Sequence, residues 1–336
     1  MDTKSELEQT RSKLKTVHQE LKMVEATIDT VDDIAVYSFN KETEDLYISK
    51  GAEKIYGFPH QQLVEKKLWK KAVHPEDKEK YEKREEKIYH GEPVMTELRI
   101  MKPSGDIRWI ILRDTPVLDS FEEVIGYTGN IIDITDRKQL EIKLKQLAYY
   151  DDLTDLANRT LLDRHLKKAM ARSKRKSHPL CVMFIDLDGF KNVNDTLGHE
   201  TGDLLLKEVA KRLNESVRDE DFISRLGGDE FIIVFEETDK HEVQDIAERV
   251  LTNISKPYNL EGKQAKVTPS IGISMYPDDG ADRETLLNNA DKAMYFAKNK
   301  GKSNYQFYSA ELPELPSKKT GIFQKIVHQI QGGLSR

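Results

Sequence analysis

The sequence predicts two consecutive domains of mixed helix and strand, joined by a helical linker. The first is expected to be an α+β domain with one antiparallel sheet and flanking helices, and the second an α+β or α/β domain with a central sheet. Three observations lead to this prediction. A length of 336 residues suits about two domains. Residues 26–136 are dominated by strand patterns, and residues 151–310 alternate longer helical and strand patterns.

Composition narrows the class of protein. The chain has 38% hydrophobic and 33% charged residues, as expected for a folded protein with charged helical surfaces. Its net charge of −6 gives no overall attraction to nucleic acid, and we interpret the basic run 172–176 as a solvated loop. The single cysteine, Cys181, lies in an apolar run. We therefore expect an inert core residue, no intrachain disulfide and a reducing, cytoplasmic location.

No part of the chain predicts a membrane-spanning helix or a signal sequence. An apolar run of about 18 or more residues is absent, so no integral membrane segment is expected. The first six residues are charged and polar, without the apolar core of a signal peptide.

Apolar residues repeat every seven positions near the N-terminus, over residues 1–25 and slightly beyond. Such a repeat, with a second set three residues later, is typical of a short coiled coil that pairs two chains. One amphipathic helix lying on its own domain is the other interpretation, because about three heptads is a marginal length. The first set is Leu7, Leu14, Leu21 and Ile28, and the second is Val17, Val24 and Val31.

The next region, residues 26–136, predicts one antiparallel sheet with helices on one side. We expect its last two strands to be joined through residues 116–123. The expected strands are residues 34–39, 46–49, 95–101, 107–113 and 124–134, and the expected short helices are residues 53–56 and 75–89.

This region resembles a PAS sensor domain. The resemblance implies that it receives a signal, but it does not identify a ligand. His60, His74 and His90 lie in no haem or flavin motif, so a small molecule, a cofactor or no ligand all stay open. The segments that carry the resemblance are Gly57–Pro59, His74–Asp77, Gly105–Trp109 and Gly126–Thr135.

Residues 137–150 predict a charged helix with a narrow apolar stripe. Leu140, Leu144 and Leu147 follow one another at spacings of four and three, which suits pairing with a second copy of the helix. A stiff helix between two domains transmits rotation better than a flexible linker, so we expect a signalling helix.

The second domain, residues 151–310, has the layout of a nucleotidyl cyclase or a polymerase palm. Its expected helices are residues 158–172, 202–217, 241–254 and 283–298; its expected strands are residues 180–187 and 266–274 and the hairpin 222–236.

The tail, residues 311–336, is expected to be a flexible end with a packed turn, or a short amphipathic helix.

The hairpin carries the most informative motif. Gly227 and Gly228 separate two apolar runs, and a tight turn there needs the positive φ that glycine adopts freely. Asp229 and Glu230 follow at once. Acids at a fixed turn, beside a backbone that a ligand can approach closely, suit a divalent cation that carries a phosphate.

A second acidic segment strengthens this interpretation. Asp186 lies at the carboxyl end of the buried strand 180–187. In such sheets, ligands bind at the carboxyl ends of the strands. If the strand and the hairpin are neighbours, Asp186, Asp229 and Glu230 converge. Three carboxylates without histidine or thiolate indicate Mg²⁺ or Mn²⁺. Without the strand segment, the hairpin acids would be ordinary turn residues.

Residues 147–308 resemble a GGDEF domain, the catalytic domain of diguanylate cyclases. Its segments occur in the family's order, and one departure is Asp155, where the family usually has glycine. We expect no loss of catalysis from it, because it lies in the lead-in to a helix. The segments are Asp151–Arg159, Asp186–His199, Gly202–Asp203, the hairpin, Ser270–Ile273 and Ala290–Lys298.

The resemblance implies condensation of two GTP into cyclic di-GMP with release of two pyrophosphates, using two Mg²⁺ or Mn²⁺ ions per active site. It implies that Asp186, the Leu187 carbonyl and Asp229 bind these ions and that Glu230 is a further ligand. Asp229 and Glu230 are thereby the catalytic residues. The metals would polarise the α-phosphate, activate the 3′-hydroxyl and neutralise the leaving group.

Substrate positions follow from the same resemblance. Backbone N–H groups of Gly189 and Phe190 would hold the β and γ phosphates, and Gly227 and Gly228 would let the substrate approach closely. Lys298 and Lys302 would add positive charge, although a solvated helix end is the plain alternative. Asn194 and Asp203 would read guanine, with a helix N-terminal acid as the alternative for Asp203, and His199 is taken as structural.

Two further expectations concern assembly and regulation. One domain holds one GTP and the product joins two, so a homodimer is part of the expected mechanism. Arg218 and Asp221 match the family's RxxD site, which predicts feedback inhibition by cyclic di-GMP; a surface ion pair is the alternative.

Three alternatives compete with this function. A non-catalytic receptor for GTP or cyclic di-GMP is disfavoured by the intact acidic and lysine positions. A bifunctional cyclase and phosphodiesterase is disfavoured because no EAL-type segment follows the second domain. A PAS-driven interaction scaffold would require an idle site, of which the sequence gives no sign.

Overall fold

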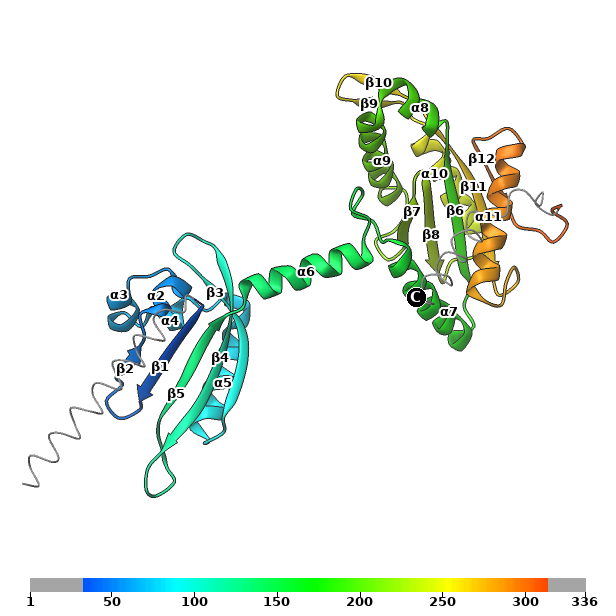
Figure 1. Cartoon of the computed structure of the whole chain (residues 1–336). Coiled ribbons are helices and arrows are strands. Elements are labelled where there is room, and N and C mark those ends of the chain that lie inside the picture. The colour runs from blue at the N-terminus through cyan, green and yellow to red at the C-terminus, as the bar shows by residue number, and fades with distance from the viewer. Residues whose placement is uncertain (1–32, 314–336) are drawn as a thin grey trace, which may run out of the picture. The chain divides into compact units, whose positions relative to one another are not determined.

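The computed structural model describes residues 33–313, and the chain divides into two compact units between Ile142 and Lys143 (Figure 1). No helix within 33–313 is both long and apolar enough to cross a bilayer. The predicted N-terminal coiled coil lies outside the described residues, as does nearly all of the predicted tail.

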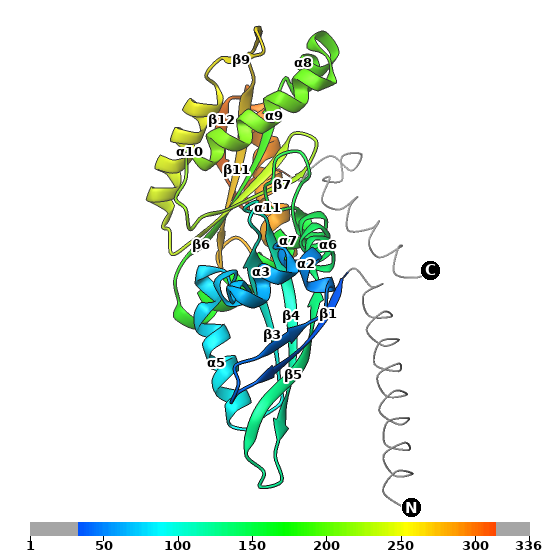
Figure 2. The same cartoon turned by 90° about the vertical axis from the view of Figure 1, so that its left-hand side faces the viewer.

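The first unit is a five-stranded antiparallel sheet in the order β2-β1-β5-β4-β3. Its helices pack on one side of this sheet (Figure 2). The strands are β1 (Ile34–Asn40), β2 (Leu46–Ile48), β3 (Val94–Met101), β4 (Ile107–Leu118) and β5 (Val124–Asp133); the helices are α2 (Gly51–Tyr56), α3 (His60–Glu65), α4 (Leu68–Lys71), the 3-10 turn η1 (Pro75–Asp77) and α5 (Lys78–Tyr89).

Alternation along the strands builds the core of this unit. In β3, Leu98 and Ile100 are fully buried toward the helices, whereas Met95 and Met101 are exposed on the other face. The same alternation gives the inward-facing residues of β4 and β5. The five predicted strands are thus confirmed, and the two predicted helical stretches correspond to α2 and to η1 with α5.

One boundary prediction for this sheet is wrong. Residues 116–118 are not part of the loop, because β4 continues to Leu118 and Pro116 pairs with Tyr127 of β5. β3 pairs with β4 only as far as Asp114, so Pro116 has a neighbouring strand on one side alone. A proline, which lacks an N–H donor, is tolerated at such an edge. Helices α3 and α4 were not predicted, because each is too short to show a helical period.

The linker is α6, Thr135–Tyr149, close to the predicted helix 137–150. Its leucines Leu140, Leu144 and Leu147 are 61%, 65% and 52% exposed, and Ile142 is 62% exposed. Large apolar side chains at this exposure leave an apolar stripe on α6 without cover among the described residues of the chain.

The second unit is a five-stranded mixed sheet in the order β12-β11-β6-β8-β7, in which only β11 and β12 run parallel. A small ribbon, β9 with β10, stands apart from it. The strands are β6 (Leu180–Asp188), β7 (Phe222–Gly227), β8 (Glu230–Glu236), β9 (Tyr258–Leu260), β10 (Lys263–Ala265), β11 (Thr268–Tyr276) and β12 (Asn304–Phe307).

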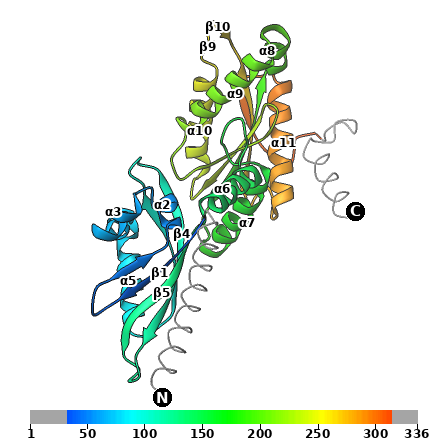
Figure 3. The ribbon, with the colours of Figure 1, turned by 60° about the vertical axis from the view of Figure 1, so that its left-hand side comes forward.

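Helices cover both faces of this sheet (Figure 3). Side chains of α9 and α10 pack on one face, and those of α7 and α11 on the other. The central strand β6 is buried throughout residues 180–187 because it contributes to both cores. The helices are α7 (Arg159–Lys176), α8 (Phe190–Leu197), α9 (His199–Asn214), α10 (Lys240–Ile254) and α11 (Arg283–Asn299).

The predicted layout of this unit is confirmed, with three differences. The basic run 172–176 is not a loop but the last turns of α7, where Arg172 donates to both carboxylate oxygens of Glu236 and Ser177 ends the helix at φ 55°. Val217 lies beyond α9, which ends at Asn214. Helix α8 and strands β9, β10 and β12 were not predicted. Cys181 is fully buried as expected, and burial raises the pKa of its thiol.

Candidate active site

Three predicted acids meet where β6 ends beside the β7–β8 hairpin. Asp186 and Glu230 are direct partners across the antiparallel β6–β8 pair. The next residue, Leu187, donates its backbone N–H to the Asp229 carbonyl over 3.2 Å. The register of two neighbouring strands therefore places the strand acid and the hairpin acids together.

The hairpin turn has the backbone that its glycines predict. Gly227 has φ 141° and Gly228 has φ 55°, and a Cβ added at either would meet open space. The positive φ, rather than crowding, is therefore the reason for glycine here. Both glycines are exposed, so the backbone on this side of Asp229 is open to a ligand.

Lys298, in the last turn of α11, reaches the same acids. Its Nζ lies 2.6 Å from Oδ2 of Asp186, whose side chain is only 8% exposed. Lys298 is thus not the freely solvated helix end of the plain alternative. Lys302, in the following loop, is exposed and has φ 64°.

The acids share a buried environment that disfavours their charged forms. Burial, with the nearby Asp229 charge, raises the pKa of Asp186 to about 6 against the opposing effect of Lys298. Burial also raises the pKa of Glu230 to about 8, with the charges of Asp186, Asp291 and Asp229 adding to the effect. The pKa of Asp229 is likewise raised by burial. The positive charge of Lys298 acts in the opposite direction on the pKa of all three acids.

Asp291 is the member of this group to which the sequence motifs assigned no role. It lies on α11 and is 8% exposed, and burial raises its pKa to about 6. The signal was present, since Asp291 stands in the Ala290–Lys298 segment, seven residues before Lys298. Two turns of helix bring both side chains to the same face of α11.

An arginine that the sequence motifs also left without a role holds the hairpin turn. Arg225 is 8% exposed, and its Nε and Nη2 donate to the Gly228 carbonyl over 3.1 and 2.8 Å. Its Nη1 donates to Oδ1 of Asp151 over 2.7 Å, and Asp151 also accepts hydrogen bonds from Thr154. Arg225 thereby ties the turn that presents Asp229 to the segment before α7.

The loop after β6 forms the start of α8. Gly189 has φ 84° and is exposed, and a Cβ there would meet open space. Phe190 follows as the first residue of α8. Asp188 is turned away from this loop, because its carboxylate accepts from the hydroxyls of Thr268 and Ser270 on β11. Free N–H groups at this helix end suit an anion.

The two predicted guanine readers lie on α8 and α9. Oδ1 of Asn194 is buried and has no hydrogen-bond partner in the described structure. A Cβ on Gly202 would lie 1.8 Å from this oxygen, so a larger residue there would have to displace the Asn194 side chain. Asp203, the next residue on α9, is exposed. The structure thus brings Asn194 against the residue that precedes Asp203.

The predicted RxxD residues lie in the loop between α9 and β7. The Arg218 backbone N–H donates to Oδ2 of Asp221 over 2.9 Å. The Arg218 guanidinium instead pairs with Glu242 in the first turn of α10, and its side chain is 52% exposed. The loop is therefore ordered by Asp221, and the guanidinium is at the surface.

The residues at the end of β6 fit a hard divalent cation by their chemistry. Oxygen donors are available from Asp186, Asp229, Glu230 and the Leu187 carbonyl, and Oε1 of Glu230 is buried with no partner in the described structure. Within 33–313, however, no three acidic, histidine or cysteine side chains are arranged as a ready metal site. Lys298 is the cation that contacts Asp186 here.

Comparison with known families decides the identity of both units. Residues 148–304 match the family model described as diguanylate cyclase, GGDEF domain, and residues 45–131 match the model described as PAS fold. The chain is a PAS domain followed by a GGDEF domain of the diguanylate cyclase family. Both resemblances drawn from the sequence are confirmed.

Curated relatives are similar over about half of the chain. A bifunctional diguanylate cyclase/cyclic di-GMP phosphodiesterase, MucR of Pseudomonas aeruginosa, is 45% identical over 51% of this chain and 25% of its own length. The diguanylate cyclase DosC of Escherichia coli is 38% identical over 48% of this chain and 35% of its own length. The chain thus spans about a quarter to a third of these relatives.

A solved structure is similar to part of the chain. A sensory box/GGDEF family protein from Caulobacter crescentus is 42% identical, over 46% of this chain and 100% of that chain, with a TM-score of 0.44.

The αL backbone of Asp155, at φ 57°, explains in physical terms why the family usually has glycine at that position.

Proposed function

We propose that this protein is a diguanylate cyclase that condenses two GTP into cyclic di-GMP and releases two pyrophosphates. The observation that carries the proposal is the group formed by buried Asp186 and Glu230 with half-buried Asp229 at the end of β6, where Lys298 contacts Asp186. Buried acids with raised pKa values, held by fixed elements, are typical of a functional site rather than of a surface.

The protein's own groups would bind and orient the nucleotide. The exposed turn at Gly189 and the first N–H groups of α8 would receive the β and γ phosphates. Lys298 and Lys302 would add positive charge on the same phosphates. Gly227 and Gly228 would allow the substrate to lie against the hairpin backbone, because no side chain fills that space.

Asn194 and Asp203 would select guanine. The unpartnered Oδ1 of Asn194 supports this role, because it is a buried acceptor that a base N–H can satisfy. A carboxylate at Asp203 can accept from the N1–H and N2–H groups of guanine, whereas adenine presents an acceptor at N1. Adenine would leave these groups unpaired, which costs binding energy.

A divalent cation, Mg²⁺ or Mn²⁺, would be held by Asp186, the Leu187 carbonyl, Asp229 and Glu230, with a second in the same site. When bound it supplies charge neutralisation at the α-phosphate and the leaving group. The raised pKa values of Asp186 and Glu230 support this assignment, since they record the cost of several buried negative charges that a cation offsets.

Catalysis would need two copies of the chain. Each GGDEF domain would hold one GTP, so each must receive the 3′-hydroxyl of the nucleotide held by its partner. The exposed leucines of α6 support a pairing surface in the linker. We further propose that the PAS domain regulates activity through α6, and that Arg218 and Asp221 bind the product as a feedback inhibitor.

The first experiment is incubation of the purified protein with GTP and Mg²⁺, with the products separated by chromatography. We expect cyclic di-GMP from the unmodified protein and none from Asp229→Ala. Glu215→Gln, an exposed acid after α9, is the matched control and should keep full activity. If no variant forms product but GTP or cyclic di-GMP still binds, the chain is either a receptor or a cyclase that awaits its PAS signal, and a search for that signal is the next experiment.

A further inference from the structure

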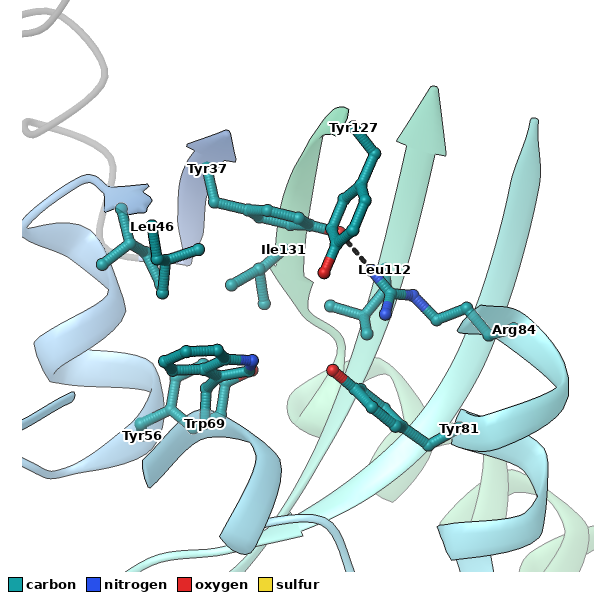
Figure 4. Close-up of a pocket in the computed structure, with 10 residues that line it drawn as sticks. Tyr37, Leu46, Tyr56, Trp69, Tyr81, Arg84, Leu112, Tyr127 and Ile131 are labelled. Carbon is teal, nitrogen blue, oxygen red and sulfur yellow. Dashed lines mark hydrogen bonds between the residues drawn. The ribbon is translucent and has the colours of Figure 1, made fainter. Parts of the chain in front are cut away.

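The buried arginine of the PAS domain has its partners within that domain. Arg84 donates to both carboxylate oxygens of Asp114 and, over 2.8 Å, to the Tyr37 hydroxyl (Figure 4). The enclosed space beside it is about 20 Å³, room for about one water molecule. This ion pair therefore belongs to the PAS core.

An acid of the GGDEF domain, Asp188, instead connects three separate segments. Asp188 is the last residue of β6 and lies opposite Thr268 of β11. Its carboxylate accepts from the hydroxyls of Thr268 and Ser270, over 3.0 and 2.9 Å, and from the backbone N–H of Ser303, over 3.2 Å. Because Ser303 immediately precedes β12, one carboxylate joins β6 and β11 to the loop between α11 and β12.

This loop has an uncommon backbone. Gly301, Lys302 and Ser303 all have positive φ, at 115°, 64° and 49°. Glycine adopts such angles freely, whereas in lysine and serine the Cβ comes too close to the following carbonyl oxygen. Residues persist in such conformations only where the surrounding structure fixes them, and they cluster at functional sites.

A second set of hydrogen bonds fixes the loop against α11. The side-chain amide of Asn304 donates to the Ala297 carbonyl over 2.7 Å and to the Lys302 carbonyl over 2.9 Å. The Lys302 N–H also donates to the Ala297 carbonyl, over 3.3 Å. Lys302 is exposed, but its backbone is thus held between Asn304 and the residue that Asp188 binds. These bonds set the direction in which the Lys302 side chain leaves the loop.

Asp188 is poorly placed to act as a further metal ligand. Its Oδ2 accepts from the Thr268 hydroxyl and the Ser303 N–H, which occupy both lone pairs of this oxygen. Its Oδ1 accepts from the Ser270 hydroxyl. A substitution at Asp188 would therefore act on the loop and on β11 rather than directly on an ion.

We propose that Asp188 is a positioning residue for the substrate, which holds the loop 301–303 in the conformation that directs Lys302 at the β and γ phosphates of GTP. This inference rests on the proposed function, in which Lys302 binds these phosphates. Without the bond from Asp188, Ser303 would be free to take a negative φ, and the Lys302 side chain would leave the loop in another direction. The charge of Lys302 would then be lost to the phosphates although the residue itself is unchanged.

A double-mutant cycle on the full-length protein tests this role through nucleotide binding. One ligand is the GTP analogue with a methylene group between its α and β phosphorus atoms, from which pyrophosphate cannot leave. The other is GMP, which has no β and γ phosphates. Isothermal titration calorimetry with Mg²⁺ would give the affinity of the analogue directly and that of GMP by competition.

We expect Lys302→Ala to weaken binding of the analogue by about 3- to 10-fold, between the values for an exposed ion pair and for a hydrogen bond to a charged group. Asp188→Asn should reproduce most of this loss, because one amide oxygen cannot accept from all three donors. In the Lys302→Ala background, Asp188→Asn should cause no further loss. GMP affinity should be the same in every variant.

Two further variants complete the design. Asn304→Ala removes the other support of the loop, so it should also weaken the analogue and cause no further loss in the Lys302→Ala background. It keeps the test decisive if Asp188→Asn does not fold. Asp278→Asn is the matched control, because Asp278 is an exposed acid beyond the opposite end of β11, and it should change neither affinity.

The outcomes separate this inference from the proposed function. If Asp188→Asn weakens the analogue equally with and without Lys302, or weakens GMP as well, Asp188 does not act through Lys302 and the inference is overturned alone. If the unmodified protein binds neither nucleotide, the proposed function is overturned and the inference with it.

Discussion

Lys298 Nζ lies 2.6 Å from Asp186 Oδ2, so the last turn of α11 places an ammonium group on the central strand of the GGDEF sheet. The contact joins segments from opposite ends of the domain sequence. It partly offsets the burial that raises the pKa of Asp186. Lys298 therefore has two roles in our proposal, neutralising the buried acids before substrate arrives and binding phosphate afterwards.

Replacing Lys298 separates this proposal from a purely structural role. We expect Lys298→Ala to lower kcat/KM for GTP by about 10- to 100-fold, the factor that corresponds to losing a hydrogen bond to a charged group. Lys298→Arg should retain part of the activity. Lys300→Ala is the control, because Lys300 is exposed and its side-chain ammonium donates to Gln306, away from the acids. Equal activity of the Lys298 and Lys300 variants would remove Lys298 from the site.

Gly202 tests the position of Asn194. A Cβ at Gly202 would lie 1.8 Å from Oδ1 of Asn194, so Gly202→Ala should displace this side chain. We expect a lower thermal midpoint by circular dichroism and weaker discrimination of GTP from ATP. The double variant Gly202→Ala with Asn194→Ala should recover stability, because the clash is gone, but not the discrimination. Recovery of both would show that Asn194 does not read guanine.

A substitution at Asp151 tests whether activity requires the hydrogen bonds that fix the Gly227–Gly228 turn through Arg225. Burial acts to raise its pKa, but hydrogen bonds from Thr154 and Arg225 hold the pKa below the usual value. Asp151→Asn should weaken the hydrogen bond between residue 151 and Arg225. Arg225 would then fix the turn before Asp229 less well. We expect a midpoint lower by about 2–4 °C for each kcal/mol lost, with a fall in kcat. Asp152→Asn, at the exposed neighbouring acid, should change neither quantity.

Much of this architecture could be predicted because it is local in the sequence. The glycine pair and the two apolar runs predict the β7–β8 hairpin, and the apolar run of β6 predicts a buried central strand. The Arg225–Asp151 contact could not be predicted, since 74 residues separate its partners. The prediction of a loop at 172–176 was wrong for a related reason. This basic run stays helical with Arg172 bonded to Glu236, an ion pair between distant segments that a charge pattern does not reveal.

The PAS domain should lose stability at acid pH through Asp77. Hydrogen bonds from Arg99 lower the pKa of this buried acid against the effect of burial. A lowered folded pKa means that the stabilisation is present above the unfolded value, about 3.9, and is lost as pH falls through the folded value. Asp77→Asn should therefore destabilise the domain at pH 7 by about 1–3 kcal/mol, and this difference should shrink as pH falls from the unfolded value toward the lowered folded value.

Tryptophan fluorescence isolates this effect, because both tryptophans of the chain lie in the PAS domain. Denaturant unfolding at several pH values would give the difference between Asp77→Asn and the unmodified protein. Glu76→Gln is the matched control. Glu76 contacts the same Arg99 at 3.0 Å but is 72% exposed, so solvent screens its contribution. A difference for Asp77→Asn that does not shrink at low pH would contradict the assignment.

The exposed stripe of α6 leads to the last prediction. Leu140, Leu144 and Leu147 are more than half exposed, and we propose that this stripe pairs with a second copy of the helix. Replacing Leu144 and Leu147 by Glu should weaken the dimer and lower cyclic di-GMP formation most at low protein concentration.

Inserting four residues into α6 rotates the GGDEF domain about the helix axis by about 40°, since each residue turns the helix by about 100°. We expect the insertion to change activity while sedimentation still shows a dimer; unchanged activity would show that the PAS domain does not act on the cyclase through this helix.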